Sequence, residues 1–139
     1  MNEPIRPSTA ISVIVADDHA AIRGRICNLL AREDDINVIA QAVDGLEAVE
    51  LVKVLQPDII LLDIGMPHLD GLKVVTQIQH LPTQVIFVTM HLRASYIRYA
   101  LKHGVKGYIL KSGLEEVIGA VRAISRGKTY YASVIVDKL

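Results

Sequence analysis

The sequence predicts one α/β domain in which helices cover both faces of a five-stranded parallel sheet. Strand-like and helix-like patterns alternate along the whole chain, as they do in βαβ proteins. The strand-like runs are continuously apolar, which is typical of strands that are buried on both faces. The chain has 139 residues, of which 51% are hydrophobic, and this suits a single domain with a sizeable core.

The first half of the chain contains three strand patterns separated by two helix patterns. The strands are expected at residues 12–17, 37–42 and 58–63. Apolar residues at helical spacing follow the first strand, from Ile22 to Leu30. In the second helix Asp44 is the expected N-cap, with Glu47 three residues later as in a capping box, and Pro57 ends the helix.

The second half continues the alternation with two more strands and three helices. A helix after Asp70 carries Leu72, Val75 and Ile78, and Pro82 interrupts the chain before the fourth strand. The remaining elements are expected as a strand at 84–89, a helix at 94–103, a strand at 106–110 and a last helix that stops at Gly127. Right-handed crossovers on both faces then give a doubly wound sheet of order 2-1-3-4-5.

Charged side chains stand where the apolar strands end. Asp17 and Asp18 close the first strand, Asp63 closes the third, and Lys111 closes the fifth. The carboxyl ends of parallel strands share one edge of the sheet, so we expect these groups to converge in one crevice. Crowded carboxylates repel one another unless a cation or proton intervenes, and Mg²⁺ prefers oxygen ligands. The pattern indicates a site for a metal ion and a phosphoryl group.

Composition argues against several classes of function, although it leaves room for a local basic patch. The chain carries 15 basic and 15 acidic residues, so no overall field attracts nucleic acid or an anionic membrane. No apolar run approaches the roughly 20 residues of a membrane helix, and the first residues do not resemble a secretory signal. The single Cys27 has no disulfide partner and is expected to be a small buried hydrophobe, which fits a reducing, cytoplasmic location. The five histidines show no zinc-ligand spacing.

Together, the strand-end residues resemble a bacterial two-component response-regulator receiver domain. The matching positions are Asp17-Asp18, Asp63, Met66-Pro67, Asp70-Gly71, Thr89 and Lys111. The resemblance spans about residues 12–127 and implies a flavodoxin-like (βα)5 fold. The segments Val88–His91 and Gly107–Ser112 are similar to the LuxR/NarL class, whose members carry a helix-turn-helix DNA-binding domain after the receiver.

The resemblance also implies an organisation of the chain. Residues 1–10, with two prolines, are expected to be a flexible arm; residues 11–127 form the receiver; and residues 128–139 begin a linker to a DNA-binding domain that this chain lacks. The chain is then expected to be part of a transcription regulator. Its partners would be a cognate sensor histidine kinase and, on activation, a second copy, with DNA contacted only through the absent domain.

By resemblance, Asp63 is the phosphoacceptor. Its carboxylate attacks the phosphoryl group of a phosphohistidine and forms an acyl phosphate. Asp17, Asp18, Asp63 and the backbone carbonyl of Gly65 would hold Mg²⁺, with Mn²⁺ as an alternative ion. Taken alone, Asp63 is better explained as a helix-capping aspartate in the loop after a strand, and only the accompanying acidic pair and lysine favour the chemical role.

Three further residues receive roles from the same resemblance. Lys111 would pair with a phosphoryl oxygen or with resting Asp63, and Thr89 would hydrogen-bond another phosphoryl oxygen. Tyr108 would be the aromatic that turns inward when Thr89 moves, and a partly buried core tyrosine is nearly as good an interpretation. Two positions depart from the usual pattern. Ser112 follows Lys111 where many receivers have proline, and the small Gly65 opens the site.

Other functions fit the sequence less well. An aspartyl-phosphate phosphatase-like enzyme wants a second acid two residues after its nucleophile, and Gly65 occupies that position. A nucleotide-binding module would need a glycine-rich phosphate loop, and neither G-x-G-x-x-G nor G-x-x-x-x-G-K-[ST] occurs. A receiver that acts as an interaction module without phosphorylation remains an alternative, although no acidic residue is missing. We therefore expect no enzyme activity beyond self-catalysed phosphotransfer and dephosphorylation.

Overall fold

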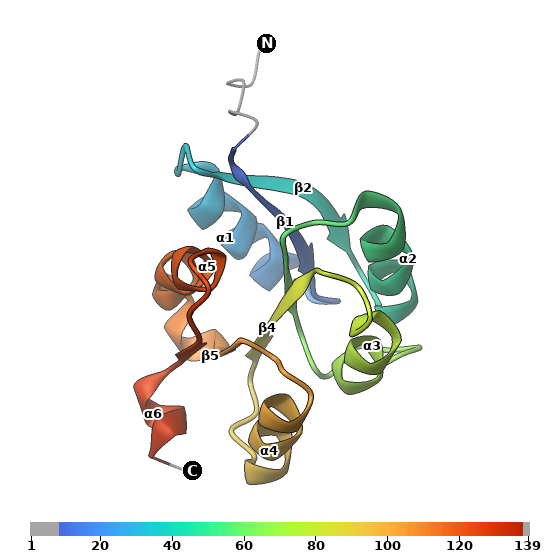
Figure 1. The fold of residues 1–139 in the computed structure, drawn as a ribbon, viewed down its shortest axis with the longest axis vertical. Helices are drawn as coiled ribbons and strands as arrows, with labels where there is room; N and C mark the ends of the chain where they lie inside the picture. Colours follow the sequence, from blue (N-terminus) through green and yellow to red (C-terminus); the bar gives the residue numbers. More distant parts are fainter. Residues whose placement is uncertain (1–8, 138–139) are drawn as a thin grey trace.

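The computed structural model describes residues 9–137, which form a parallel sheet with helices on both faces (Figure 1). The sheet order is β2-β1-β3-β4-β5-β6, and every neighbouring pair is parallel. The strands are β1 (Ile11–Ala16), β2 (Ile36–Ala42), β3 (Ile59–Leu62), β4 (Gln84–Thr89), β5 (Gly107–Leu110) and β6 (Tyr130–Tyr131). The predicted order 2-1-3-4-5 is confirmed, with a short sixth strand added at the β5 edge.

The helices form two layers. They are α1 (Ala20–Ala31), α2 (Gly45–Leu55), α3 (Gly71–Ile78), α4 (Ala94–Lys102), the 3-10 helix η1 (Lys111–Glu116), α5 (Val117–Ser125) and α6 (Ser133–Val136). Helices α1 and α5 lie on one face of the sheet, and α2, α3 and α4 lie on the other (Figure 1). The buried side chain of Ile135 in α6 joins the apolar cluster under α2, α3 and α4. None of the described helices is long and apolar enough to cross a membrane.

The end of the chain differs from the prediction. A single last helix was expected after Lys111, but the backbone leaves helical geometry at Gly113 (φ −126°, ψ 46°), which separates the 3-10 turn from α5. In the expected linker region, β6 and α6 pack against the domain, and neither was predicted. Most of the expected N-terminal arm, residues 1–8, lies outside the described residues.

The helix starts follow the local signals in the sequence. The side chain of Asp44 accepts a hydrogen bond from the N–H of Glu47 (2.8 Å), and Glu47 Oε1 accepts one from the N–H of Val43 (3.1 Å). Asp70 caps α3 in the same way, through the N–H of Lys73 (2.9 Å). These bonds satisfy backbone donors that the first turn of a helix leaves free. They also fix where the loops after β2 and β3 end.

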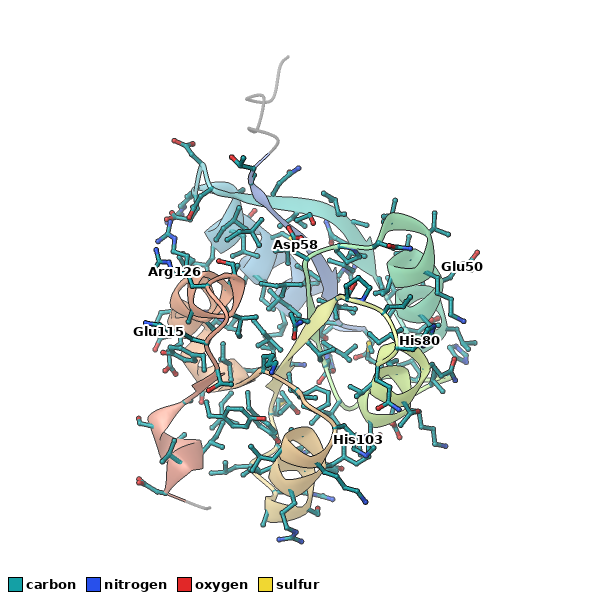
Figure 2. All side chains as sticks on the ribbon, in the orientation of Figure 1. Glu50, Asp58, His80, His103, Glu115 and Arg126 are labelled. Carbon is teal, nitrogen blue, oxygen red and sulfur yellow. The ribbon has the colours of Figure 1, made fainter. Side chains whose placement is uncertain are left out.

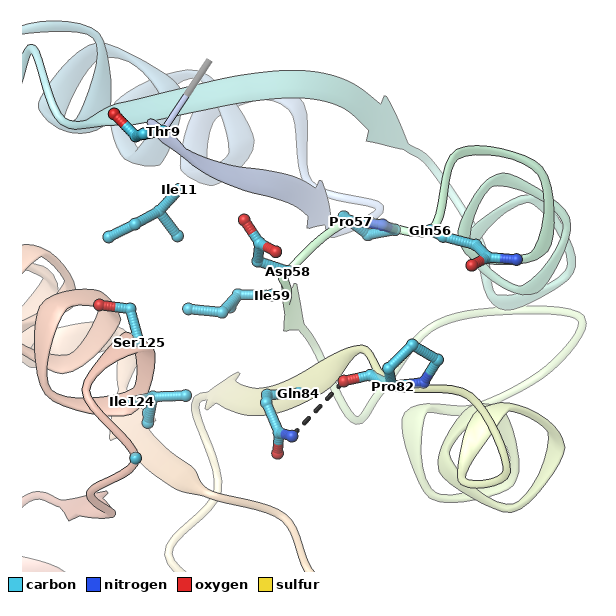
Figure 3. A pocket seen from close by; sticks show the side chains of 11 residues that line it. Thr9, Ile11, Gln56, Pro57, Asp58, Ile59, Pro82, Gln84, Ile124 and Ser125 are labelled. Atoms are coloured by element: carbon cyan, nitrogen blue, oxygen red, sulfur yellow. Dashed lines mark hydrogen bonds between the residues drawn. The ribbon is translucent and has the colours of Figure 1, made fainter. Parts of the chain in front are cut away.

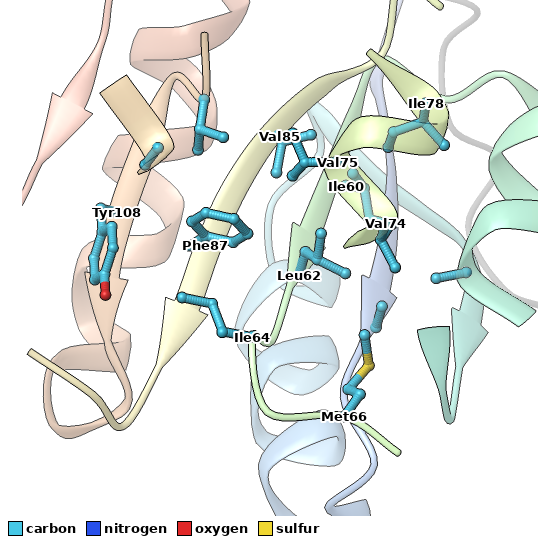
Figure 4. Packing of buried hydrophobic residues seen from close by; sticks show 14 of the residues in the cluster. Ile60, Leu62, Ile64, Met66, Val74, Val75, Ile78, Val85, Phe87 and Tyr108 are labelled. Carbon is cyan, nitrogen blue, oxygen red and sulfur yellow. The ribbon is translucent and has the colours of Figure 1, made fainter. Parts of the chain in front are cut away.

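Alternate strand residues divide the core into two halves. Val13, Val15, Ile59, Leu61, Ile86, Val88 and Ile109 face α1 and α5. Ile14, Ala16, Ile60, Leu62, Val85, Phe87 and Tyr108 face the other helices, and Figure 4 shows several of them against α3. Charged residues such as Glu50, Glu115 and Arg126 lie on the outside of the helices (Figure 2).

The hydrogen bonds between neighbouring strands continue one residue beyond the ends of β1 and β3. The N–H of Asp17 bonds the carbonyl of Ala42 (3.0 Å), and the N–H of Asp63 bonds the carbonyl of Ala16 (3.0 Å). By the two-residue period of a strand, Asp17 and Asp63 therefore follow the face that packs against α1 and α5. Thr89 follows Phe87 onto the opposite face.

Candidate functional site

Acidic side chains meet at the carboxyl ends of β1 and β3, as predicted. Asp17 is 1% exposed and Asp63 is 4% exposed, whereas Asp18 lies on the surface beside them. Because β1 and β3 are neighbours in the sheet, the loops that follow them start side by side. One ligand atom from each of Asp17, Asp18, His19 and Asp63 lies within 4.8 Å of all the others.

Lys111 completes the cluster from β5. Its Nζ lies 2.9 Å from Asp17 Oδ2 and 3.2 Å from Asp63 Oδ2, and its side chain is only 6% exposed. Since β4 stands between β3 and β5, the lysine reaches across the end of that strand. The ammonium thus bridges two buried carboxylates whose negative charges would otherwise repel each other.

The charges in the cluster are not balanced. Burial and the neighbouring charge of Asp17 raise the pKa of the Asp63 carboxyl, and Lys111 only partly offsets them. Burial acts to lower the pKa of Lys111, but its hydrogen bonds to and charge contacts with Asp17 and Asp63 outweigh that effect and raise it. Three carboxylates around one ammonium leave excess negative charge, so the donor set fits a hard divalent cation such as Mg²⁺.

His19 and Arg23 belong to the surroundings of the cluster and were not predicted. His19 Nδ1 lies 3.2 Å from Asp17 Oδ1 and 3.3 Å from Asp18 Oδ1. Arg23 Nη1 donates to the backbone carbonyl of Asp17 (2.8 Å), which fastens the loop to α1. The available signal for His19 is its place directly after the acidic pair, because spacing to the other histidines and to Cys27 indicates no zinc site.

Two glycines shape the loop after β3. The N–H of Gly65 lies 3.4 Å from Asp63 Oδ1, and a Cβ at Gly65 would meet no atom within 4 Å, so this position is open. Coordination of a metal by the Gly65 carbonyl stays a prediction. At Gly71 a Cβ would lie 2.4 Å from the carbonyl oxygen of Asp63, so only glycine lets α3 approach the strand end this closely.

Thr89 and Tyr108 are fully buried and both bond the backbone of His91. Thr89 Oγ1 accepts a hydrogen bond from the N–H of His91 (3.3 Å), and the Tyr108 hydroxyl donates to the carbonyl of the same residue (2.8 Å). The Tyr108 ring packs edge-on against Phe87, with centroids 5.9 Å apart. Burial raises the pKa of Tyr108, so its hydroxyl remains a donor. Tyr108 therefore points inward in this structure.

Two surface hollows differ in their position relative to the acidic cluster. A cavity of about 520 Å³ lies at the amino ends of β3 and β4, where it is lined by Asp58, Ile59 and Gln84 (Figure 3). It is therefore at the sheet edge opposite the acidic cluster. A smaller hollow of about 320 Å³, lined by Ile22 and Met90 among others, borders Lys111 itself. The larger of these two cavities therefore lies away from the acidic cluster.

Comparisons with known proteins agree with this geometry. Residues 13–122 match the response regulator receiver domain family. The chain is 37% identical over 130 residues to the transcriptional regulatory protein DesR of Bacillus subtilis, covering 93% of this chain and 65% of that protein. It is 36% identical over 124 residues to the oxygen regulatory protein NreC of Staphylococcus carnosus, covering 86% and 57%. The chain thus spans about three fifths of the length of these relatives.

Solved structures give the same result. The signal receiver domain of the putative response regulator NarL from Mycobacterium tuberculosis superposes with a TM-score of 0.82 at 34% identity, covering 86% of this chain and 98% of that one. A LuxR-family two-component response regulator from Aurantimonas gives a TM-score of 0.84 at 26% identity, covering 93% and 94%. With its acidic pocket and lysine at the strand ends, the chain belongs to the response regulator receiver domain family and is similar to the receivers of LuxR-family transcription regulators.

Proposed function

We propose that this receiver takes a phosphoryl group onto Asp63 from the phosphohistidine of a sensor histidine kinase. The observation that supports this most strongly is the bridge that Lys111 makes between Asp63 and Asp17, at 3.2 and 2.9 Å. It holds the Asp63 carboxylate at the end of a strand, next to a fixed positive charge. Such preorganised charge stabilises a transferring phosphoryl group without further rearrangement.

The residues of the cluster take different parts in the transfer. A carboxylate oxygen of Asp63 forms a bond to phosphorus as the bond from phosphorus to the histidine nitrogen breaks, and the imidazole keeps the electron pair. Lys111 Nζ and the hydroxyl of Thr89 donate to phosphoryl oxygens. Asp17 and Asp18 would hold Mg²⁺ together with Asp63. When bound, this ion neutralises phosphoryl charge.

Phosphorylation of Asp63 would act on parts of the protein outside the phosphoryl site. In the longer protein that the relatives suggest, the receiver would control a DNA-binding output domain in the cytoplasm and would dimerise when phosphorylated. DesR is named a transcriptional regulatory protein and NreC an oxygen regulatory protein, and we extend only the regulatory role to this chain. Gly65 in place of a second acid speaks against a phosphatase-like enzyme.

The test is intact-protein mass spectrometry after treatment with acetyl phosphate and Mg²⁺. The wild-type chain is expected to gain one phosphoryl group, and Asp63→Asn none, because an amide is a poor nucleophile. Asp58→Asn is the matched control, because Asp58 precedes the same strand at the opposite edge and is exposed. Labelling of Asp63→Asn at the wild-type level would remove Asp63 from the mechanism. Labelling that persists in chelator would leave the acidic pair with a structural role only.

A further inference from the structure

The C-terminal segment, residues 130–136, is attached to the edge of the sheet. The N–H of Tyr130 bonds the carbonyl of Lys106 (2.9 Å), and the N–H of Ala132 bonds the carbonyl of Tyr108 (3.1 Å). These bonds make β6 a parallel neighbour of β5, with Tyr131 in register with Tyr108. The segment therefore extends the strand that carries the candidate switch residue.

Side chains of the C-terminal segment share the core that surrounds Tyr108. Ala132 is 3% exposed and Ile135 is fully buried, and both lie in the same apolar cluster as Tyr108. The rings of Tyr131 and Tyr108 are tilted against each other with centroids 6.2 Å apart, and the Tyr131 hydroxyl donates to the carbonyl of Val105 (2.8 Å). The C-terminal segment thus contacts both the backbone and the ring of Tyr108.

At its other end Tyr108 is connected to the candidate phosphoryl site. Its hydroxyl bonds the carbonyl of His91, whose N–H bonds Thr89 Oγ1. A hydroxyl has one donor and two acceptor positions, so Thr89 can accept from His91 while its own proton goes to a phosphoryl oxygen. The observed arrangement of Thr89, His91 and Tyr108 is therefore compatible with an occupied site and becomes stronger when Thr89 donates.

We propose that docking of the C-terminal segment on β5 and phosphorylation of Asp63 stabilise each other through Tyr108. A phosphoryl group that engages Thr89 holds the His91 peptide in place, and that peptide holds the Tyr108 hydroxyl inward. The inward ring supplies the surface on which Tyr131 and Ile135 pack. The segment that leads out of the receiver is then the element that reports the state of Asp63. This inference rests on the proposed function.

Thermodynamic reciprocity makes the inference measurable from both ends. If a ligand at Asp63 strengthens docking of the C-terminal segment by some factor, then loss of docking must lower the affinity for that ligand by the same factor. Typical couplings begin at about fivefold, which sets the expected size. Beryllofluoride with Mg²⁺ serves as the probe, because it mimics a phosphoryl group on an aspartate without being hydrolysed.

The first measurement is amide hydrogen exchange of the 139-residue chain with and without the probe. The reporters are three backbone amides of the C-terminal segment that donate hydrogen bonds: Tyr130 to Lys106, Ala132 to Tyr108 and Ile135 to Ala132. These amides are expected to exchange at least about fivefold more slowly when the probe is bound. Unchanged or faster exchange at these three amides would overturn the proposal.

The second measurement is the affinity for beryllofluoride of variants in α6. Ile135→Asp puts a charge into the buried docking face, whereas Val134→Asp adds the same charge to a neighbour that is 45% exposed. Ile135→Asp is expected to weaken binding about fivefold or more, and Val134→Asp to leave it unchanged. Tyr131→Phe, which removes only the bond to Val105, is a gentler variant expected to act in the same direction by a smaller factor.

The outcomes separate the two proposals. If the wild-type chain does not bind the probe at Asp63, the proposed function fails. If it does bind, and Ile135→Asp and Tyr131→Phe bind it as tightly as Val134→Asp does, only the coupling through Tyr108 is refuted.

Discussion

Replacing Lys111 by methionine is expected to destabilise the metal-free protein by about 3–5 kcal/mol, the usual cost of breaking a buried ion pair. Methionine keeps the length of the side chain and removes its charge. With an effective dielectric constant of about 20, the contacts at 2.9 and 3.2 Å each supply roughly 5–6 kcal/mol of attraction. Several kcal/mol for taking the ammonium out of water offset part of that sum.

Thermal unfolding in chelator at neutral pH measures the effect. A loss of about 4 kcal/mol corresponds to a fall in Tm of roughly 10–15 °C for a domain of this size. Lys102→Met is the control, because this exposed lysine on α4 should change stability by less than about 0.5 kcal/mol. Added Mg²⁺ should recover more stability in Lys111→Met than in the wild type, because the two unbridged carboxylates attract a cation more strongly. Saturation at about 100 times Kd contributes about 2.7 kcal/mol.

Two results would contradict this reasoning. One is a loss below about 1 kcal/mol in chelator, since it would mean that the carboxylates do not depend on the bridge. The other is equal stabilisation of both proteins by Mg²⁺, which would mean that the ion does not sense the charge of Lys111.

Three further predictions concern the loops and the C-terminal segment. Asp18→Asn should weaken Mg²⁺ binding in calorimetry by about tenfold, or ~1.4 kcal/mol, while unfolding shifts little because the side chain is 29% exposed. Gly71→Ala should cost about 1–3 kcal/mol in urea unfolding and slow acetyl phosphate labelling, because its Cβ would displace the Asp63 carbonyl; an unchanged labelling rate would argue against that displacement. Burial raises the pKa of Tyr131 to about 12 from an ordinary value of 10.0, so its neutral form favours folding. That contribution is complete below pH 10 and is lost as the pH rises through 12, so the stability of β6 against local unfolding should fall more steeply with rising pH in the wild type than in Tyr131→Phe, as followed by amide exchange.

The sheet order and the acidic cluster could be predicted because they follow from local patterns and one topological rule. Continuous apolar runs marked β1, β3 and β4, and parallel strands place their carboxyl ends at one edge. That rule alone brought Asp17, Asp63 and Lys111 together.

The remainder depends on tertiary contacts that local patterns do not carry. β6 has two residues and follows the polar pair Lys128-Thr129, so no apolar run in the sequence indicates a strand. Its pairing depends on the edge of the sheet that β5 presents. The link between Thr89 and Tyr108 passes through the backbone of His91, which any residue type could provide. A hydrogen bond to the backbone therefore cannot be predicted from the residue type at position 91.

The alternation of strand side chains has a consequence for how such a domain can diverge. Val15 and Leu61 lead along one face to the acidic groups, while Phe87 leads along the other to Thr89. A substitution under α4 or α6 therefore acts first on Thr89 and Tyr108, which connect the site to the C-terminal segment. Substitutions beneath α1 and α5 act first on the carboxylates. Mutational tolerance is expected to be unequal on the two sides of one sheet, and new signalling partners can be acquired without moving the three carboxylates.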